Sequence, residues 1–134
     1  MRIAVCVDDQ NGMLFNRRRQ SQDRLLREDL LREAGDRPLW INAYSARQFG
    51  PLPPNVRTAE DFLEQAGPGE FCFVEDQDIL PYQERIEGVL IYRWNRRYPA
   101  DTRFPLSLEG WKLERREEFP GSSHERITKE VYRL

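Results

Sequence analysis

The sequence predicts an α/β fold with a mainly parallel central sheet flanked by helices and a C-terminal antiparallel hairpin. Short apolar runs alternate with helical patterns through the first half of the chain, which is the order that parallel sheets require. Two alternating segments end the chain, separated by the turn-rich residues 120–123. The 134 residues are 39% hydrophobic and 33% charged, a globular composition. We therefore expect a single domain over residues 1–134.

The first half contains two expected strands and two expected helices. The apolar runs Met1–Val7 and Leu39–Ile41 are typical of strands buried on both faces. Between them, a stripe of leucines predicts a helix over residues 21–34 with Ser21 as its N-cap. A second helix is expected over residues 58–66, because Thr58 is followed three residues later by an acidic side chain, as in a capping box.

In the second half of the chain the sequence predicts strands and no helix. Phe71–Val74 is a third buried-type run, and Val89–Trp94 is a fourth. The segments Trp111–Phe119 and Arg126–Leu134 predict an antiparallel hairpin that closes one edge of the sheet.

Composition excludes several classes of function. The chain carries 21 basic and 23 acidic residues, a net charge of −2, which argues against a nucleic-acid partner or an anionic membrane. No apolar run reaches the roughly 20 residues that cross a bilayer, so we expect a cytoplasmic protein with no membrane partner. The only histidine, His124, lies in a polar loop, which predicts a solvated side chain and disfavours a zinc site or a Ser-His-Asp triad.

Two cysteines, Cys6 and Cys72, lie inside apolar segments without the spacing of a metal or redox motif. We expect reduced, packed thiols that face each other on adjacent strands. Parallel neighbours seldom reach disulfide geometry, so a redox pair is disfavoured.

The C-terminal third resembles dihydrofolate reductase. The stretch LIYRWNRRYPADTRFPLSLEGWKLERREEF, followed by KEVYRL, has that family's strand, its Asp-Thr-x-Phe-Pro turn at residues 101–105, a tryptophan at the next strand and a final strand. The stretch VDDQNGMLF is similar to the family's first strand and the start of its mobile active-site loop, and FGPLP at residues 49–53 is similar to its Pro-Leu-Pro connection. The resemblance covers nearly the whole chain and implies the family's fold, with Met1–Val7 and Phe71–Val74 as parallel neighbours and Leu39–Ile41 beyond the second.

The departures from the family concern its cofactor, NADPH. Family members place a Gly-Gly pair after the strand that matches Phe71–Val74, so that backbone amides approach the pyrophosphate; Glu75 and Asp76 stand there in this chain. Like charges about 4 Å apart cost roughly 4 kcal/mol at an effective dielectric constant near 20. Residues 42–45 lack the family's phosphate-binding arginine, and we expect the segment that cradles adenosine to be absent between Pro53 and Thr58. NADPH binding is therefore disfavoured.

The folate side departs as well. The family's Leu-Pro-Trp stretch is replaced by residues 17–21, which include three consecutive arginines. The family's pterin-protonating acid matches only Asp23, with Glu28 or Asp29 as worse alternatives, and its strand threonine falls near Tyr92. A residual NAD(P)H-dependent reductase is a disfavoured hypothesis.

Carboxyl ends of parallel strands meet at one edge of a sheet, where open α/β folds bind ligands. This predicts an acidic crevice whose residues are Asp8, Asp9, Asn42, Tyr44, Ser45, Glu75 and Asp76, with Arg17, Arg18 and Arg19 nearby. Three interpretations follow. The acids are solvated strand ends; or the arginines pair with them and close the groove; or Asp8, Asp9, Glu75 and Asp76 hold Mg²⁺ or Ca²⁺ while the arginines contact phosphate.

The leading hypothesis is a dihydrofolate-reductase-like domain that has lost its NADPH site and binds a small ligand or a protein partner without reductase activity. No cofactor is predicted, although Mg²⁺ is an option. The enzyme alternative is a metal-dependent phosphohydrolase or nuclease with Asp8, Asp9 or Asp23 as catalytic candidates. RNA binding by the arginines beside Tyr92, Trp94 and Tyr98 is disfavoured by the overall charge.

Overall fold

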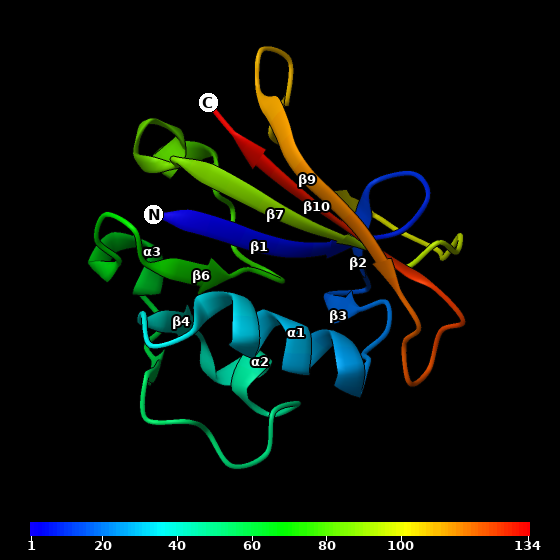
Figure 1. The fold of residues 1–134 in the computed structure, drawn as a ribbon, viewed down its shortest axis with the longest axis horizontal. Helices are drawn as coiled ribbons and strands as arrows, with labels where there is room; N and C mark the ends of the chain where they lie inside the picture. The colour runs from blue at the N-terminus through cyan, green and yellow to red at the C-terminus, as the bar shows by residue number, and fades with distance from the viewer.

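The computed structural model describes residues 1–134 and is built on a seven-stranded sheet of order β5-β4-β6-β1-β7-β10-β9 (Figure 1). The five strands from β5 to β7 are parallel, and β10 runs antiparallel to both β7 and β9. The predicted parallel sheet with a closing hairpin is confirmed, as is β6 lying between β1 and β4. The strands are β1 (Arg2–Val7), β4 (Leu39–Ile41), β5 (Val56–Thr58), β6 (Phe71–Phe73), β7 (Gly88–Arg93), β9 (Lys112–Phe119) and β10 (Ile127–Arg133).

Helix α1 (Arg24–Ala34) lies across one face of the sheet (Figure 1). Its N-cap is Asp23, whose carboxylate accepts from the Leu26 amide at 3.1 Å, so the predicted cap at Ser21 is wrong. The helix begins after Asp23 because the amides of Ser122 and Ser123, in a loop near the end of the chain, also donate to its carboxylate and fix its position. The other helical segments are short: α2 (Ala43–Ala46), α3 (Phe62–Gln65) and the 3₁₀ segment Leu80–Arg85. None of the helices has the length and apolar character needed to span a membrane.

The helix predicted over residues 58–66 is mostly absent. Residues 56–58 form β5, which pairs in parallel with β4 with Thr58 opposite Ile41, and only α3 remains helical. Pairing with β4 therefore overrides the local capping pattern, because Thr58 belongs to the strand and cannot cap a helix. A short strand after the Pro-Leu-Pro connection is thus retained, contrary to the expected direct passage from Pro53 into a helix.

A second, three-stranded sheet of order β3-β2-β8 lies beyond the carboxyl end of β1 and was not predicted. It consists of β2 (Gly12–Phe15), β3 (Arg18–Arg19) and β8 (Thr102–Arg103). The turn between β2 and β3 has Asn16 at φ 51° and Arg17 at φ 62°. Such turns usually carry Asn-Gly, and because Arg17 replaces the glycine, the sequence carries no signal of a hairpin here.

The core lies on both faces of the large sheet. One cluster packs under α1 and includes Leu30, Phe73 and Tyr92, and the other packs on the opposite face. Because Ile3 is the register partner of Cys72, Cys72 points to the face opposite Cys6. The expectation that the two thiols face each other is therefore wrong. Both are unpaired, and burial raises the pKa of Cys72 to about 12.

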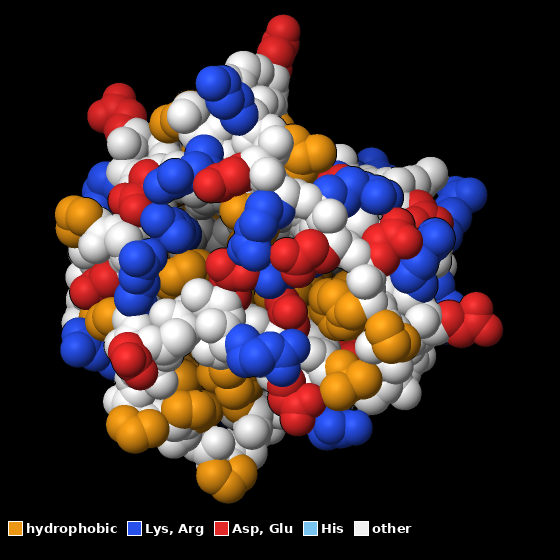
Figure 2. All heavy atoms as spheres, viewed as in Figure 1, with side chains coloured by type: hydrophobic (Ala, Val, Ile, Leu, Met, Phe, Trp, Pro, Cys, Tyr) orange, Lys and Arg blue, Asp and Glu red, His pale blue; other side chains and the backbone are white.

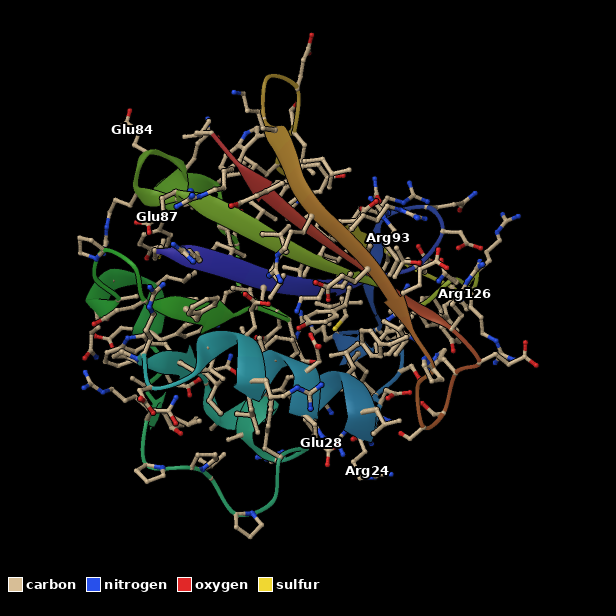
Figure 3. All side chains as sticks on the ribbon, viewed as in Figure 1. Arg24, Glu28, Glu84, Glu87, Arg93 and Arg126 are labelled. Carbon is tan, nitrogen blue, oxygen red and sulfur yellow. The ribbon has the colours of Figure 1, made fainter.

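Charged side chains of both signs lie beside one another over most of the face in Figure 2. On α1 an exposed pair of this kind, Arg24 and Glu28, is 3.4 Å apart (Figure 3). Exposed pairs of this kind contribute about 0.5 kcal/mol or less to stability. The informative charges are therefore the buried ones and the unpaired ones.

Candidate functional site at the carboxyl edge of the sheet

The topology places a candidate ligand edge at the ends of β1 and β6. From β1 the chain moves outward to β4, whereas from β6 it crosses to β7 on the other side of β1. Ligands of open α/β sheets bind where the direction of winding reverses in this way. Two segments line this edge: the residues that follow β6, and the β2–β3 hairpin.

The Glu75 carboxylate is held by four donor groups at this edge. Arg19 donates from Nε at 2.9 Å and from Nη2 at 3.1 Å, Ser45 from its hydroxyl at 2.8 Å, and Gln48 from its amide at 3.0 Å. The Glu75 side chain is only 9% exposed. Burial alone would lower the pKa of Arg19, but the Glu75 carboxylate raises it above its ordinary value. The charge that follows β6 is thus neutralised within the molecule. We call Arg19, Ser45, Gln48 and Glu75 the Glu75 cluster.

The same arginine ties the β2–β3 hairpin to α2. Its Nη2 donates to the Tyr44 carbonyl at 3.0 Å, its backbone amide donates to the Tyr44 hydroxyl at 2.8 Å, and its guanidinium lies 4.2 Å from the centre of the Tyr44 ring. Asn42 caps α2 and donates to Asp76 at 2.8 Å. The structure therefore brings six of the predicted crevice residues together, in the arrangement of a groove closed by an internal ion pair: Arg19, Asn42, Tyr44, Ser45, Glu75 and Asp76.

Asp8 does not join this group. Its buried carboxylate accepts from the amides of Gly12 at 2.7 Å, Gln10 at 2.9 Å and Tyr98 at 3.1 Å. Burial alone would raise the pKa of Asp8, but these amides lower it below its usual value. Asp8 therefore fastens the turn after β1 to the loop after β7. Neighbouring Asp9 is exposed.

The four acids considered as metal ligands do not gather at one site. Nowhere in residues 1–134 do three or more His, Cys, Asp or Glu side chains lie so that they could hold a metal ion. The predicted ligands Asp8, Asp9, Glu75 and Asp76 do not form a ligand set, because Asp8 and Glu75 belong to separate hydrogen-bond networks. The predicted phosphate ligands Arg17 and Arg18 are exposed and form no ion pair.

Beneath the Glu75 cluster lies a small cavity, with Cys6, Met13, Val74 and Trp94 among its lining residues. Arg19, Gln20 and Ser21 of the hairpin region also line it. The cavity measures about 10 Å³, which is room for about one water molecule. No planar ring can enter this space while the hairpin is in place.

Asp23, the predicted acid, has a structural environment. In addition to the Leu26 amide it binds the amides of Ser122 at 3.0 Å and Ser123 at 2.8 Å, and its side chain has no exposed area. Burial alone would raise the pKa of Asp23, but these amides hold it well below its usual range. A side chain on Gly121 would collide with the Asp23 carboxylate, which explains the glycine. An ionised, enclosed carboxylate is unsuited to protonating a substrate, so this environment favours a structural role for Asp23 over that of the candidate acid.

His124 is buried, contrary to the prediction of a solvated side chain. Its Nε2 lies 2.8 Å from the Tyr98 hydroxyl, its Nδ1 lies 2.9 Å from the Ser123 hydroxyl, and its ring stacks on Trp94 at 4.6 Å. The ring therefore joins the loop after β7 to the β9–β10 turn. Sequence reasoning missed this role because the partners are distant in the chain.

A buried charge network on the α1 face also escaped sequence reasoning. Lys129 is 2.9 Å from Asp29 and 2.6 Å from Glu33, and the Tyr92 hydroxyl donates to Asp29 at 2.6 Å. Burial would lower the pKa of Lys129, but hydrogen bonds to Glu33 and Asp29 raise it above its ordinary value. Tyr92 is fully buried between α1 and the sheet. Asp29, an alternative for the acid, is thus also engaged in internal contacts.

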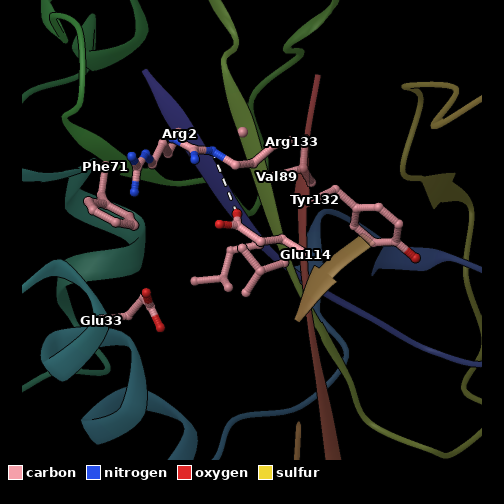
Figure 4. Close-up of a pocket in the computed structure, with 10 residues that line it drawn as sticks. Arg2, Glu33, Phe71, Val89, Glu114, Tyr132 and Arg133 are labelled. Atoms are coloured by element: carbon pink, nitrogen blue, oxygen red, sulfur yellow. Dashed lines mark ion pairs between the residues drawn. The ribbon is translucent and has the colours of Figure 1, made fainter. Parts of the chain in front are cut away.

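One further cavity lies near the amino end of β7, on the α1 face of the sheet (Figure 4). It measures about 20 Å³, and Arg2 lies 5.7 Å from the ring centre of Phe71 on its wall. Arg133 and Glu114 form an ion pair of 3.6 Å across it. Its charges are paired and its volume is small, so it offers little room for a ligand.

Comparison with known proteins bears on the fold. No protein-family model and no curated protein matches the sequence. A solved structure of dihydrofolate reductase from Enterococcus faecalis, complexed with NADP(H) and RAB-propyl, is similar to this chain with a TM-score of 0.71 at 11% sequence identity. The similarity covers 98% of this chain and 94% of that one. The chain therefore has a dihydrofolate-reductase-like α/β fold.

Proposed function

We propose that this chain is a binding protein built on the dihydrofolate reductase fold, without a dinucleotide site and without reductase activity. The observation that carries the proposal is the Glu75 cluster, which occupies the end of β6 where the resemblance places a glycine pair. A fold supports many functions, and the side chains at its ligand edge decide which one it has.

The charge at this edge opposes a dinucleotide. To approach the end of β6, a pyrophosphate would have to separate Arg19 from Glu75 or accept the carboxylate as a neighbour. A carboxylate about 4 Å from a phosphate costs roughly 4 kcal/mol at an effective dielectric constant near 20, which corresponds to about a thousandfold in affinity.

The small cavity at this edge leaves no room for a pterin, the second substrate of a dihydrofolate reductase. The cavity under the hairpin holds about 10 Å³, and the candidate acids Asp23 and Asp29 are both bound internally. The cavity has no room for a pterin ring, and neither Asp23 nor Asp29 is free to donate a proton to one. These features support binding without catalysis.

Titration with NADPH, followed by nicotinamide fluorescence, tests the proposal. We expect no binding at micromolar concentrations, whereas a dihydrofolate reductase assayed in parallel binds. In the variant Glu75→Gly/Asp76→Gly, Arg19 loses its partner, so we expect inorganic pyrophosphate to bind more tightly than to the unaltered chain in calorimetry. The double variant Glu84→Gly/Asp36→Gly, which removes one exposed glutamate and one exposed aspartate elsewhere, serves as the charge-matched control. Micromolar binding of NADPH by the unaltered chain would overturn the proposal.

A further inference from the structure

The geometry points to a single-stranded nucleic acid as the partner, bound at one end of the molecule. We define this basic end as residues 8–20 and 94–104, which hold the small sheet and the loop after β7. It contains six arginines and three aspartates, whereas the other 110 residues contain 15 basic and 20 acidic side chains. The overall charge of −2 therefore hides a positive region, which removes the argument against nucleic acid drawn from composition.

Backbone hydrogen bonds hold the two segments together as one unit. Gly12 of β2 is the register partner of Arg103, the Asp101 amide donates to the Leu14 carbonyl at 3.0 Å, and the Asp9 amide donates to the Arg96 carbonyl at 2.9 Å. The arginines of both segments therefore belong to the same end of the molecule.

Five of the six arginines at this end are exposed and form no ion pair. The aspartates do not neutralise them: Asp8 is buried on three amides, Asp101 accepts from the Asn16 amide at 3.0 Å, and Asp9 forms no ion pair. Free guanidinium groups bind phosphate oxygens with two hydrogen bonds each. Five of them exceed what one phosphate group needs, which favours a chain of phosphates. These residues are Arg17, Arg18, Arg96, Arg97 and Arg103.

Aromatic side chains lie among these arginines. Phe15, which is 44% exposed, and Tyr98 line a cleft of about 440 Å³ together with Arg18. A second cleft of about 370 Å³ is lined by Trp94, Arg96, His124, Glu125 and Arg126, so one acid also faces it. The Tyr98 hydroxyl bonds to His124, which links the two clefts. Of these rings Phe15 is exposed, whereas Trp94 is buried and stacked on His124. Unstacked bases bind exposed aromatic rings, so Phe15 among free arginines fits a single strand better than a duplex or an acidic peptide.

The hairpin turn supports the same assignment. Arg17 has φ 62°, a left-handed conformation that favours glycine, and its exposed side chain forms no hydrogen bond or ion pair within the chain. Strained backbone is common at binding sites. Contact with a phosphate would account for an arginine at this position.

Fluorescence anisotropy with labelled oligouridine and oligothymidine of about 12 nucleotides, long enough to cross both clefts, tests the inference. We expect micromolar binding at low salt. Arg17→Gln/Arg18→Gln should weaken it by roughly tenfold and reduce the salt slope by about 1.4, because each single-strand phosphate contact contributes about 0.7. Phe15→Ser should weaken it by roughly fivefold or more through lost stacking. The matched control Arg37→Gln/Arg47→Gln removes two exposed arginines outside the basic end and should change binding less than twofold.

Several results would overturn the inference. These are no binding of single strands at low salt, an equal loss in the control variant, binding of polyglutamate or of a duplex as tight as that of the single strand, or an unchanged affinity in Phe15→Ser. The inference goes beyond the proposed function and can fail separately from it, because the tested residues do not contact Glu75. NADPH titration of the same variants reports on the Glu75 cluster alone.

Discussion

The three consecutive arginines of the β2–β3 hairpin divide between two regions that treat charge differently. Arg19 is partly buried and bound to Glu75, so its charge holds the hairpin against the sheet. Arg17 and Arg18 are exposed and have no carboxylate partner. The comparison teaches that a run of like charges has no single role: paired members hold this structure together, and unpaired members remain free for a partner. Paired and unpaired charges should therefore respond differently to substitution.

The largest effect is expected at Lys129, the most enclosed cation. Lys129→Met removes the buried cation that Asp29 and Glu33 share and leaves them only the exposed arginines Arg32 and Arg115. Loss of one partner from a buried pair costs about 4 kcal/mol. Urea denaturation measures the free energy of unfolding. Lys112→Met, at an exposed position on β9 without an ion pair, should change it by less than about 0.5 kcal/mol. Equal costs for the two variants would remove the distinction between paired and unpaired charges.

Asp23 should make stability depend on acid. Its pKa is lower in the folded chain than the unfolded value of about 3.9, so its contribution is fully present above that pH and is lost as the pH falls below it. Asp23→Asn should lower the free energy of unfolding at pH 7 by about 3 kcal/mol and flatten its decline in acid, because amides of the cap and loop lose a charged acceptor. Exposed Asp36→Asn is the control. An unchanged acid slope in the Asp23 variant would contradict the assignment.

The ion pair of the Glu75 cluster should show an intermediate effect. A double-mutant cycle with Arg19→Gln and Glu75→Gln should give a coupling energy of about 1.5 kcal/mol, reduced from that of a fully buried pair because the Arg19 side chain is 20% exposed. The same cycle at the exposed pair of Arg24 and Glu28 should give about 0.4 kcal/mol. If both cycles give the same value, the hairpin is not held by this pair.

The smallest effect is expected at the hairpin turn and has the opposite sign. Arg17→Gly should stabilise the chain by about 0.5 kcal/mol, because glycine adopts the left-handed conformation without strain. The same variant should weaken oligonucleotide binding. Arg18→Gly, which has no positive φ, should give no stabilisation in the same urea titration.

The sequence predicted most of the large sheet because β1, β4, β6 and β7 are short apolar runs and turn-rich residues separate β9 from β10. It predicted the local helical segments less well. The residues at Thr58 do form a capping pattern, but Thr58 pairs with Ile41 of β4 as part of a strand and therefore does not cap a helix. The small sheet escaped because its strands are too short for a period to appear, and because Arg17 stands where a glycine would mark the turn.

The crevice was predicted in part for a geometric reason. Residues that follow β4 and β6 met at one edge, as parallel strands require. Asp8 was misplaced because the chain turns back immediately after β1, and its carboxylate is bound by the amides of that turn. The partners of Asp23 and His124 come from opposite ends of the chain, and such contacts leave no local pattern in a single sequence.

The bonds between Arg19 and its partners also set a time scale. A molecule larger than water that enters the cavity beneath the Glu75 cluster must wait until the hairpin detaches from α2 and from the end of β6. When the open hairpin recloses more slowly than the molecule enters, the rate of entry equals the rate of hairpin detachment. It is then independent of the concentration of the entering molecule. The rate at which the hairpin opens then limits how fast any molecule reaches the cavity.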